Sequence, residues 1–392
     1  MKQNSTILID GYFGGRNGGD ELILASIIDK VRKADRQSKI VVTSRDTNYT
    51  QQHHDVGKVI QPFSFPSDLA RATQVINDVD EIWIGSGESF NEIYPKYTLL
   101  TVIARVCGAS IRIICAGATQ LNPSKTESRL LQAIASQASV VSVRDPVSKQ
   151  NFIESGITDI KQFADLVFDY EPDWHVEAKC PGDYEFVISV REPSDRKVDY
   201  ESLAQGIDRA ANTLDTKPCL LAMDTSNGTD TSPSDISAIR SLSSKLDTDH
   251  HILDDLDFKE KYAVISRANI LLGMRLHSII TAISCQVPYV HVMYNRKCQV
   301  HMDWLSDGQA MWCDNIDPDC LAESVIARYD NMEFYRERAT QIEKIKSLST
   351  AAIESATQYS TARTRLFLLS IVWWFAINQF SDNYSNIYTQ RE

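Results

Sequence analysis

The sequence predicts an α/β protein with two Rossmann-like domains that face each other across a cleft, followed by a helical C-terminal segment. Short apolar runs of strand length alternate with helix-length segments, the alternation stops once at a polar stretch, and it then starts again. The chain has 392 residues, which is more than one hydrophobic core normally accommodates. Two domains are therefore expected.

The first alternating series predicts an N-terminal domain over residues 1–175. Its apolar runs are typical of buried parallel strands and lie at 6–9, 40–43, 81–84, 112–115 and 140–143. Helical patterns such as 21–31 and 97–106 separate them. The stretch 170–183 is polar and contains two prolines, so we interpret it as an interdomain linker.

The second series predicts a C-terminal domain over residues 183–345. Its expected strands lie at 186–190, 219–223, 269–272, 289–293 and 310–312. From residue 318 to about residue 380 the pattern is helical. We therefore expect a helical extension over 346–392.

Composition limits the classes of function. A hydrophobic content of 43% and a charged content of 23% are typical of soluble globular proteins. The net charge of −12 repels phosphate backbones, and no run of Lys and Arg offsets it, so nucleic-acid binding is disfavoured. An anionic substrate must then be held by a few well-placed cations.

The sequence also favours a cytoplasmic location. The eight cysteines form no C-x-x-C pair, which is typical of free thiols in a reducing compartment. A strand is expected almost at the N-terminus, without the apolar region of a signal peptide. The apolar stretch 366–377 is shorter than the roughly 20 residues that span a bilayer. It is either a helix packed on the protein body or an interfacial helix that contacts the inner face of a membrane peripherally.

Two glycine-containing turns follow predicted strands in the first domain. The first, at 11–21, reads GYFGGRNGGDE and opens a helix, where glycines permit a close approach to a ligand and the free N–H groups face it. Asn17 and Asp20 are its polar candidates, and Asp20 is also a suitable N-cap; a purely structural turn is the alternative. The second turn contains Gly85 and Glu88, which could contact a polar ligand.

Arg144 follows the strand expected at 140–143. A guanidinium at the edge of a sheet can bind a carboxylate or a phosphate through two parallel hydrogen bonds. The alternative is a structural ion pair between Arg144 and Asp165, which comes from the next strand-end segment.

In the second domain, a predicted strand ends at Gly273 and a helix then begins with Arg275 and His277. Histidine is the usual proton carrier near neutral pH, and the helix N-terminus favours an anion beside it. Lys297 follows the next strand, so Lys297 and His277 are expected at the same edge of the sheet; a solvated turn is the alternative for Lys297. The histidine pairs at 53–54 and 250–251 lack accompanying ligands, and no metal site is predicted.

In this order, the motifs resemble those of the polysaccharide pyruvyl transferase family. The family pattern has a Gly-Tyr-x-Gly-x-x-Asn-x-Gly-Asp-Glu turn and a glycine-rich loop, followed by Arg-Asp-x-x-Ser, Ala-Asp, Gly-x-Arg-x-His and Tyr-x-x-Lys. These motifs occur here between residues 11 and 297, and the resemblance spans roughly residues 7 to 300. It implies a GT-B-like fold with acceptor binding in the first domain and phosphoenolpyruvate binding in the second.

The resemblance also implies the chemistry. Family members transfer pyruvate from phosphoenolpyruvate to two hydroxyls of a sugar, which forms a cyclic ketal and releases phosphate. The implied phosphoenolpyruvate-binding residues are Arg144, His277 and Lys297, with Arg275 beside them, and His277 is the best-placed acid or base. Asn17, Asp20, Gly85 and Glu88 remain acceptor-side or loop candidates. Phosphoenolpyruvate is a co-substrate, and the scheme requires neither a cofactor nor a metal.

Two loops depart from the family pattern. Gly85-Ser86-Gly87 replaces the commoner three glycines, and Asn295-Arg296 replaces the usual Asp-Pro before Lys297. Because both loops are expected to face the substrate, the acceptor sugar, in a polysaccharide or in its lipid- or nucleotide-linked precursor, could be an unusual one. The alternatives are a GT-B glycosyltransferase that uses a nucleotide sugar and a non-catalytic carbohydrate-binding protein of the same fold.

Overall fold

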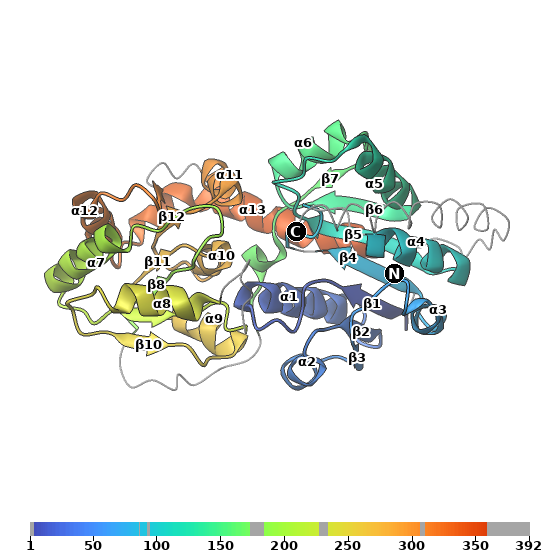
Figure 1. Ribbon diagram of the computed structural model, residues 1–392, viewed down its shortest axis with the longest axis horizontal. Coiled ribbons are helices and arrows are strands. Elements are labelled where there is room, and N and C mark those ends of the chain that lie inside the picture. The colour runs from blue at the N-terminus through green and yellow to red at the C-terminus, as the bar shows by residue number, and fades with distance from the viewer. Residues whose placement is uncertain are drawn as a thin grey trace.

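The computed structural model describes residues 4–85, 87–91, 95–172, 184–226, 234–305 and 310–358. These residues form two α/β domains that lie side by side, as Figure 1 shows. Every described pair of strands is parallel, which confirms the prediction of two Rossmann-like domains. The apolar stretch 366–377 lies outside the described residues, as does most of the expected linker.

The first domain contains a seven-stranded sheet in the order β3-β2-β1-β4-β5-β6-β7. Its strands are β1 (Thr6–Asp10), β2 (Lys39–Thr43), β3 (Lys58–Ile60), β4 (Glu81–Gly85), β5 (Ser110–Ala116), β6 (Ala138–Val143) and β7 (Lys161–Gln162). The helices between them are α1 (Gly18–Ala34), α2 (Thr47–His53), α3 (Leu69–Asn77), α4 (Pro95–Cys107), α5 (Lys125–Gln137) and α6 (Pro146–Glu154), and the 3₁₀ turn η1 (Leu166–Asp169) follows.

The second domain contains a six-stranded sheet in the order β10-β9-β8-β11-β12-β13. Its strands are β8 (Phe186–Ser189), β9 (Cys219–Leu221), β10 (His251–Leu253), β11 (Ile270–Gly273), β12 (Tyr289–Met293) and β13 (Met311–Trp312). Its helices are α7 (Tyr200–Leu214), α8 (Asp235–Ser243), α9 (Phe258–Ser266), α10 (Leu276–Ser284), α11 (Arg296–Leu305) and α12 (Pro318–Arg328). Helix α13 (Glu333–Gln358) then leaves this domain.

Three strands that the sequence patterns did not predict are β3, β7 and β10. All three are edge strands of two or three residues. Such short segments are not long enough to show the period-2 alternation that identifies a strand. The ten predicted strands are all present, with ends that shift by up to two residues.

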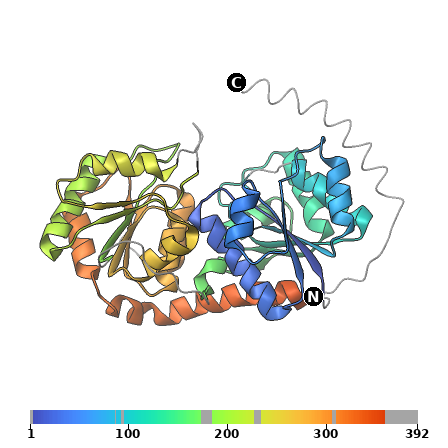
Figure 2. The same ribbon diagram turned by 90° about the horizontal axis from the view of Figure 1, so that it is seen from below.

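Helix α13 joins the two domains, and Figure 2 shows it running beneath both of them. A boundary was expected at residue 345, but one continuous helix crosses that position. In its second half, Thr350 Oγ1 donates to Asp169 Oδ2 at 2.6 Å, and Ser349 also donates to Asp169. Lys30 of α1 forms an ion pair with the same carboxylate at 2.6 Å. These contacts therefore fasten the second half of α13 to the first domain.

One hydrophobic core extends through both domains. It starts on the face of the first sheet that α1 covers, passes through η1 and α10, and continues into the second sheet. A separate core lies on the opposite face of the first sheet, under α3, α4 and α5. No helix within the described ranges is long and apolar enough to cross a membrane.

We expect Asp169→Ala to lower the free energy of unfolding by about 2–3 kcal/mol, because it leaves the largely buried Lys30 amine without its carboxylate and removes two hydrogen bonds of α13. Urea unfolding measures the change. Glu343→Ala, on the exposed face of the same helix, is the control. If the two variants are equally stable, Asp169 does not anchor α13.

Candidate functional site

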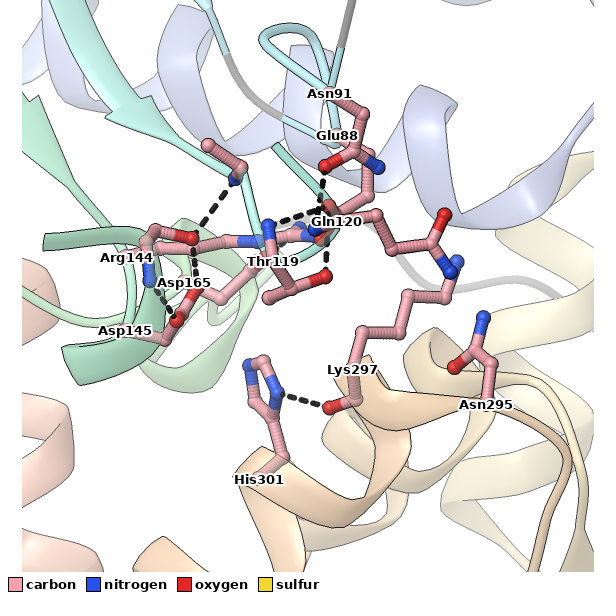
Figure 3. A network of polar contacts seen from close by, with 12 residues as sticks. Glu88, Asn91, Thr119, Gln120, Arg144, Asp145, Asp165, Asn295, Lys297 and His301 are labelled. Atoms are coloured by element: carbon pink, nitrogen blue, oxygen red, sulfur yellow. Dashed lines mark hydrogen bonds and ion pairs between the residues drawn. The ribbon is translucent and has the colours of Figure 1, made fainter. Parts of the chain in front are cut away.

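The candidate residues lie where strands of both sheets end. Asp20 is in the first turn of α1, after β1, and Arg144 directly follows β6. His277 lies in the first turn of α10, after β11, and Lys297 in the first turn of α11, after β12. Figure 3 shows the first-domain side chains Arg144 and Glu88 on one side and Lys297 of α11 on the other.

The Arg144 guanidinium is buried between two carboxylates. Its Nη1 donates to Asp165 Oδ2 at 2.7 Å, and its Nη2 donates to Glu88 Oε1 at 2.6 Å (Figure 3). Burial opposes the charge of Arg144, but the two carboxylates outweigh it and raise its pKa above the ordinary value. The ion pair with Asp165, which was the alternative to ligand binding, is thus present. Glu88 binds the second Nη nitrogen of the guanidinium.

Both carboxylate oxygens of Glu88 accept hydrogen bonds. Besides the bond from Arg144, its Oε2 accepts from the Thr119 backbone N–H at 3.1 Å and from the Thr119 hydroxyl at 3.0 Å. Burial opposes ionisation, yet Arg144 and Lys297 prevail and lower the pKa of Glu88 to about 2. Glu88 is therefore ionised at neutral pH and is a poor proton acceptor there.

Gly85, the other candidate of this loop, has a structural role. Its φ is +148°, and a Cβ at this position would lie 2.3 Å from the Ile114 carbonyl oxygen. Glycine is therefore needed where β4 ends beside β5.

His277 connects the two domains at the site. Its Nε2 lies 3.5 Å from Asp165 Oδ2, which is long for a hydrogen bond but within range of an ion pair when the ring is protonated. Burial opposes ionisation of Asp165, but His277 and Arg144 lower its pKa below the ordinary value. On the other side of the ring, a Cβ on Gly19 would lie 2.3 Å from Nδ1. The imidazole thus lies between Asp165 and the start of α1.

Asp20 is the acidic residue best suited to exchange a proton near neutral pH. Burial raises its pKa to about 6, and the neighbouring His277 and Lys297 only partly offset this effect. Within the described part of the chain, its carboxylate has no hydrogen bond or ion pair. The N-cap of α1 is Asn17, whose side chain accepts from the Gly19 N–H at 3.1 Å, so the expectation that Asp20 caps the helix was wrong.

Asn17 also lies at the contact between the glycine-containing turn and the second domain. It forms an antiparallel bridge with Asp224, and the neighbouring Gly18 N–H donates to the Met223 carbonyl at 2.7 Å. The buried Lys261 amine donates to the same Met223 oxygen at 3.1 Å and to the Arg16 carbonyl at 3.3 Å. The turn is therefore both structural and close to the site.

Arg275 supports the contact between the glycine-containing turn and the second domain, because it binds Asp224. Its Nη2 donates to Asp235 Oδ1 at 2.6 Å and to Asp224 Oδ2 at 3.1 Å, and its Nε also donates to Asp235. All three residues are largely buried. The guanidinium that was expected beside the donor is thus engaged by two carboxylates, and its contact with a donor stays a prediction. Sequence reasoning missed Asp224, Asp235 and Lys261, because nothing in their local sequence shows that they meet.

Lys297 differs from these arginines because its charge is not compensated by contact. Among the residues that the structure describes, its ammonium has no hydrogen bond or ion pair. It lies 5.6 Å from the centre of the Tyr294 ring, and Figure 3 shows it extending from α11 towards Gln120. Lys297 therefore has donors available for a ligand.

The fold and the site together define a two-domain GT-B-like protein with acidic and basic side chains at the strand ends where its domains meet. The family model for polysaccharide pyruvyl transferase matches residues 17–296, and the chain belongs to that family. No curated protein matches the chain.

Solved structures with the same fold include several sugar-nucleotide enzymes. The UDP-GlcNAc 2-epimerase from Methanocaldococcus jannaschii superposes with a TM-score of 0.59 at 12% identity, over 90% of this chain and 99% of the epimerase. The UDP-GlcNAc 2-epimerase from Neisseria meningitidis, bound to UDP-GlcNAc, superposes with a TM-score of 0.57 at 13% identity, over 90% of this chain and 100% of that enzyme. A spinosyn forosaminyltransferase superposes with a TM-score of 0.52 at 12% identity, over 91% of this chain and 99% of the transferase. At such identities the likeness shows the fold alone.

We expect Asp20→Asn to stabilise the protein at neutral pH. Because the folded-state pKa of about 6 exceeds the ordinary aspartate value of 3.8, the folded protein binds the proton more tightly than the unfolded chain, and ionisation costs stability as pH rises through this range. The variant should therefore gain about 2 kcal/mol over the wild type at pH 7.5 and almost nothing near pH 4.

Urea unfolding at several pH values measures this difference. Asp78→Asn, at an exposed position, serves as the control and should change stability by less than about 0.5 kcal/mol. A gain for Asp20→Asn that does not depend on pH would contradict the role of ionisation.

Proposed function

We propose that the protein transfers pyruvate from phosphoenolpyruvate to two hydroxyls of a sugar, in a polysaccharide or in its lipid- or nucleotide-linked precursor. The products are a cyclic pyruvate ketal and phosphate. The observation that carries the proposal is the position of His277, which lies beside Asp20 and Asp165 at the edge where the uncompensated Lys297 also lies. Membership in the polysaccharide pyruvyl transferase family supports it.

The proposed chemistry needs one proton donor and one proton acceptor. A sugar hydroxyl attacks C2 of phosphoenolpyruvate and loses its proton, while C3 gains a proton and becomes a methyl group. The bond from C2 to the phosphate oxygen then breaks and phosphate leaves. The second hydroxyl attacks C2 and closes the ketal, and its proton leaves with the phosphate. In water these steps are slow, and positioned acid–base groups accelerate them.

We assign His277 as the acid that protonates C3. A protonated imidazole is stabilised by Asp165, whose Oδ2 lies 3.5 Å away, and Arg144 holds that carboxylate in place from the other side. Asp20 is the better base for a sugar hydroxyl, because its pKa of about 6 permits both protonation states near neutral pH. Glu88 is unsuited to this role, since its carboxylate is strongly bound and its pKa is about 2.

Lys297 is the donor-binding residue that the geometry supports most directly, because its ammonium is free to bind the donor's carboxylate or phosphate within the described structure. Both Nη groups of Arg144 already donate to carboxylates, which leaves only its buried Nε without a hydrogen-bond partner among the described residues. We therefore assign Arg144 mainly to positioning Glu88 and Asp165.

The decisive assay incubates the protein with phosphoenolpyruvate and candidate glycans. We expect phosphate release together with a glycan that has gained a pyruvate ketal, as detected by mass spectrometry. Turnover of a nucleotide sugar without any reaction of phosphoenolpyruvate would instead identify a glycosyltransferase. Binding of glycans with neither reaction would identify a non-catalytic carbohydrate-binding protein.

We expect His277→Ala to lower kcat by about 10²- to 10⁴-fold, with a much smaller effect on the KM for phosphoenolpyruvate, because the imidazole acts in proton transfer. Steady-state kinetics measures both constants. His251→Ala removes an exposed histidine of the same domain and should leave both unchanged. Full activity of His277→Ala would refute the assignment.

We expect Gly19→Ala to reduce kcat at least tenfold, because the new methyl group would lie 2.3 Å from His277 Nδ1 and must displace the ring. Gly15→Ala is the matched control in the same turn, since no atom lies within 4 Å of its added Cβ. Equal loss of activity in the two variants would mean that the turn, and not the ring position, is responsible.

A further inference from the structure

Arg191, which no sequence motif singled out, lies at the same edge of the second sheet as His277 and Lys297. It is the second residue after β8, and β8 pairs with β11, as does β12. The Met274 N–H also donates to the Ser189 carbonyl at 2.7 Å, which holds the segments after β8 and β11 together. Each of these three neighbouring strands is thus followed, within four residues, by a basic residue or a histidine.

Arg191 and Lys297 lie around one buried aromatic ring. The Arg191 guanidinium carbon is 4.6 Å from the centre of the Tyr294 ring, and the Lys297 amine is 5.6 Å from it. Arg191 Nη1 donates to the Tyr294 hydroxyl at 3.2 Å, which fixes the guanidinium relative to the ring. Both cations act electrostatically on the buried Cys298 thiol, which is consistent with their lying close together.

Charge compensation separates Arg191 from Arg144, Arg275 and Arg196. Arg144 and Arg275 each bind two carboxylates, and Arg196 is paired with Asp314 at 2.6 Å. Arg191 has no carboxylate partner among the described residues. The carboxylate of the adjacent Glu192 accepts a hydrogen bond from the Tyr200 hydroxyl at 2.6 Å instead.

Arg191 also has an unused donor. Its Nε is shielded from solvent and has no hydrogen-bond partner among the described residues. A buried N–H without a partner costs stability, and a water, an ion or a ligand that approaches it can satisfy it. An uncompensated guanidinium and an uncompensated ammonium, both near the Tyr294 ring and the latter at the start of α11, are suited to a phosphate with two negative charges.

We propose that Arg191 and Lys297 together bind the phosphate group of the substrate, with Tyr294 holding the guanidinium in place. This inference takes the phosphate-bearing donor from the proposed function. It places the leaving phosphate over α11, near His277, and leaves Arg144 and Arg275 as positioning residues that keep the surrounding carboxylates in place.

Titration calorimetry with inorganic phosphate, and separately with phosphoenolpyruvate, tests the proposal on the full-length protein. We expect Arg191→Gln and Lys297→Met each to weaken binding of both anions about tenfold or more. Arg191→Lys, which retains the charge but not the planar fork, should show a smaller loss. Thermal unfolding of each variant establishes that it is folded.

Arg196→Gln is the matched control. Arg196 belongs to the same loop and stacks on an aromatic ring, with its guanidinium carbon 4.3 Å from the centre of Trp312, but its charge is paired. This variant should bind phosphate within about twofold of the wild type. Equal weakening by Arg191→Gln and Arg196→Gln would mean that general surface charge is responsible, and it would overturn the proposal. Wild-type affinity in Arg191→Gln, or no measurable binding by the wild type, would overturn it as well.

The failure of this inference can be told apart from the failure of the proposed function. If both anions bind in an Arg191-dependent manner but no glycan gains a ketal, the phosphate site stands and the pyruvyl transfer fails. If ketal forms and Arg191→Gln leaves the KM for phosphoenolpyruvate unchanged, the transfer stands and the phosphate site fails.

Discussion

The bridge between Asn17 and Asp224 is the contact on which the site depends. It joins the start of α1 to the second domain, and so sets the distance between Asp20 and His277, which come from different sheets. Arg275 holds Asp224 through an ion pair at 3.1 Å, and Lys261 supports the adjoining carbonyl groups. These contacts therefore fix the relative position of Asp20 and His277, the residues to which we assign proton transfer.

Charge compensation distinguishes the structural ions from those available for chemistry. Buried charges are tolerated when they are paired and hydrogen-bonded, as Arg144, Arg275 and Glu88 are. Asp20, Lys297 and Arg191 lack carboxylate or ammonium partners among the described residues. Leaving them unpaired costs folding stability, and such a cost is typical of sites that bind or transform a ligand. The overall charge of −12 makes these local cations more significant, since the general field repels an anion.

The sequence was sufficient to predict the alternating architecture and the strand ends, because hydrophobic periodicity is a local property. It placed His277 and Lys297 at one edge correctly, since they follow neighbouring strands. It could not show that Glu88 binds Arg144, or that the carboxylates of Asp224 and Asp235 occupy Arg275, because those partners are distant in sequence. A motif identifies a charged residue but does not reveal whether the fold has already neutralised it.

This limit explains why sequence reasoning missed Arg191. Arg144 stands in a recognisable Arg-Asp-x-x-Ser motif, yet both arms of its guanidinium are bound within the protein. Arg191 stands in no such motif, yet it has no carboxylate partner in the described structure, and its Nε, like that of Arg144, is buried without a partner there. A buried donor can be satisfied only by a group that approaches it, and the edge of the second sheet is where an incoming phosphate would do so. Unsatisfied charge at the edge where the strands end is therefore a more direct guide to the ligand than the motif itself.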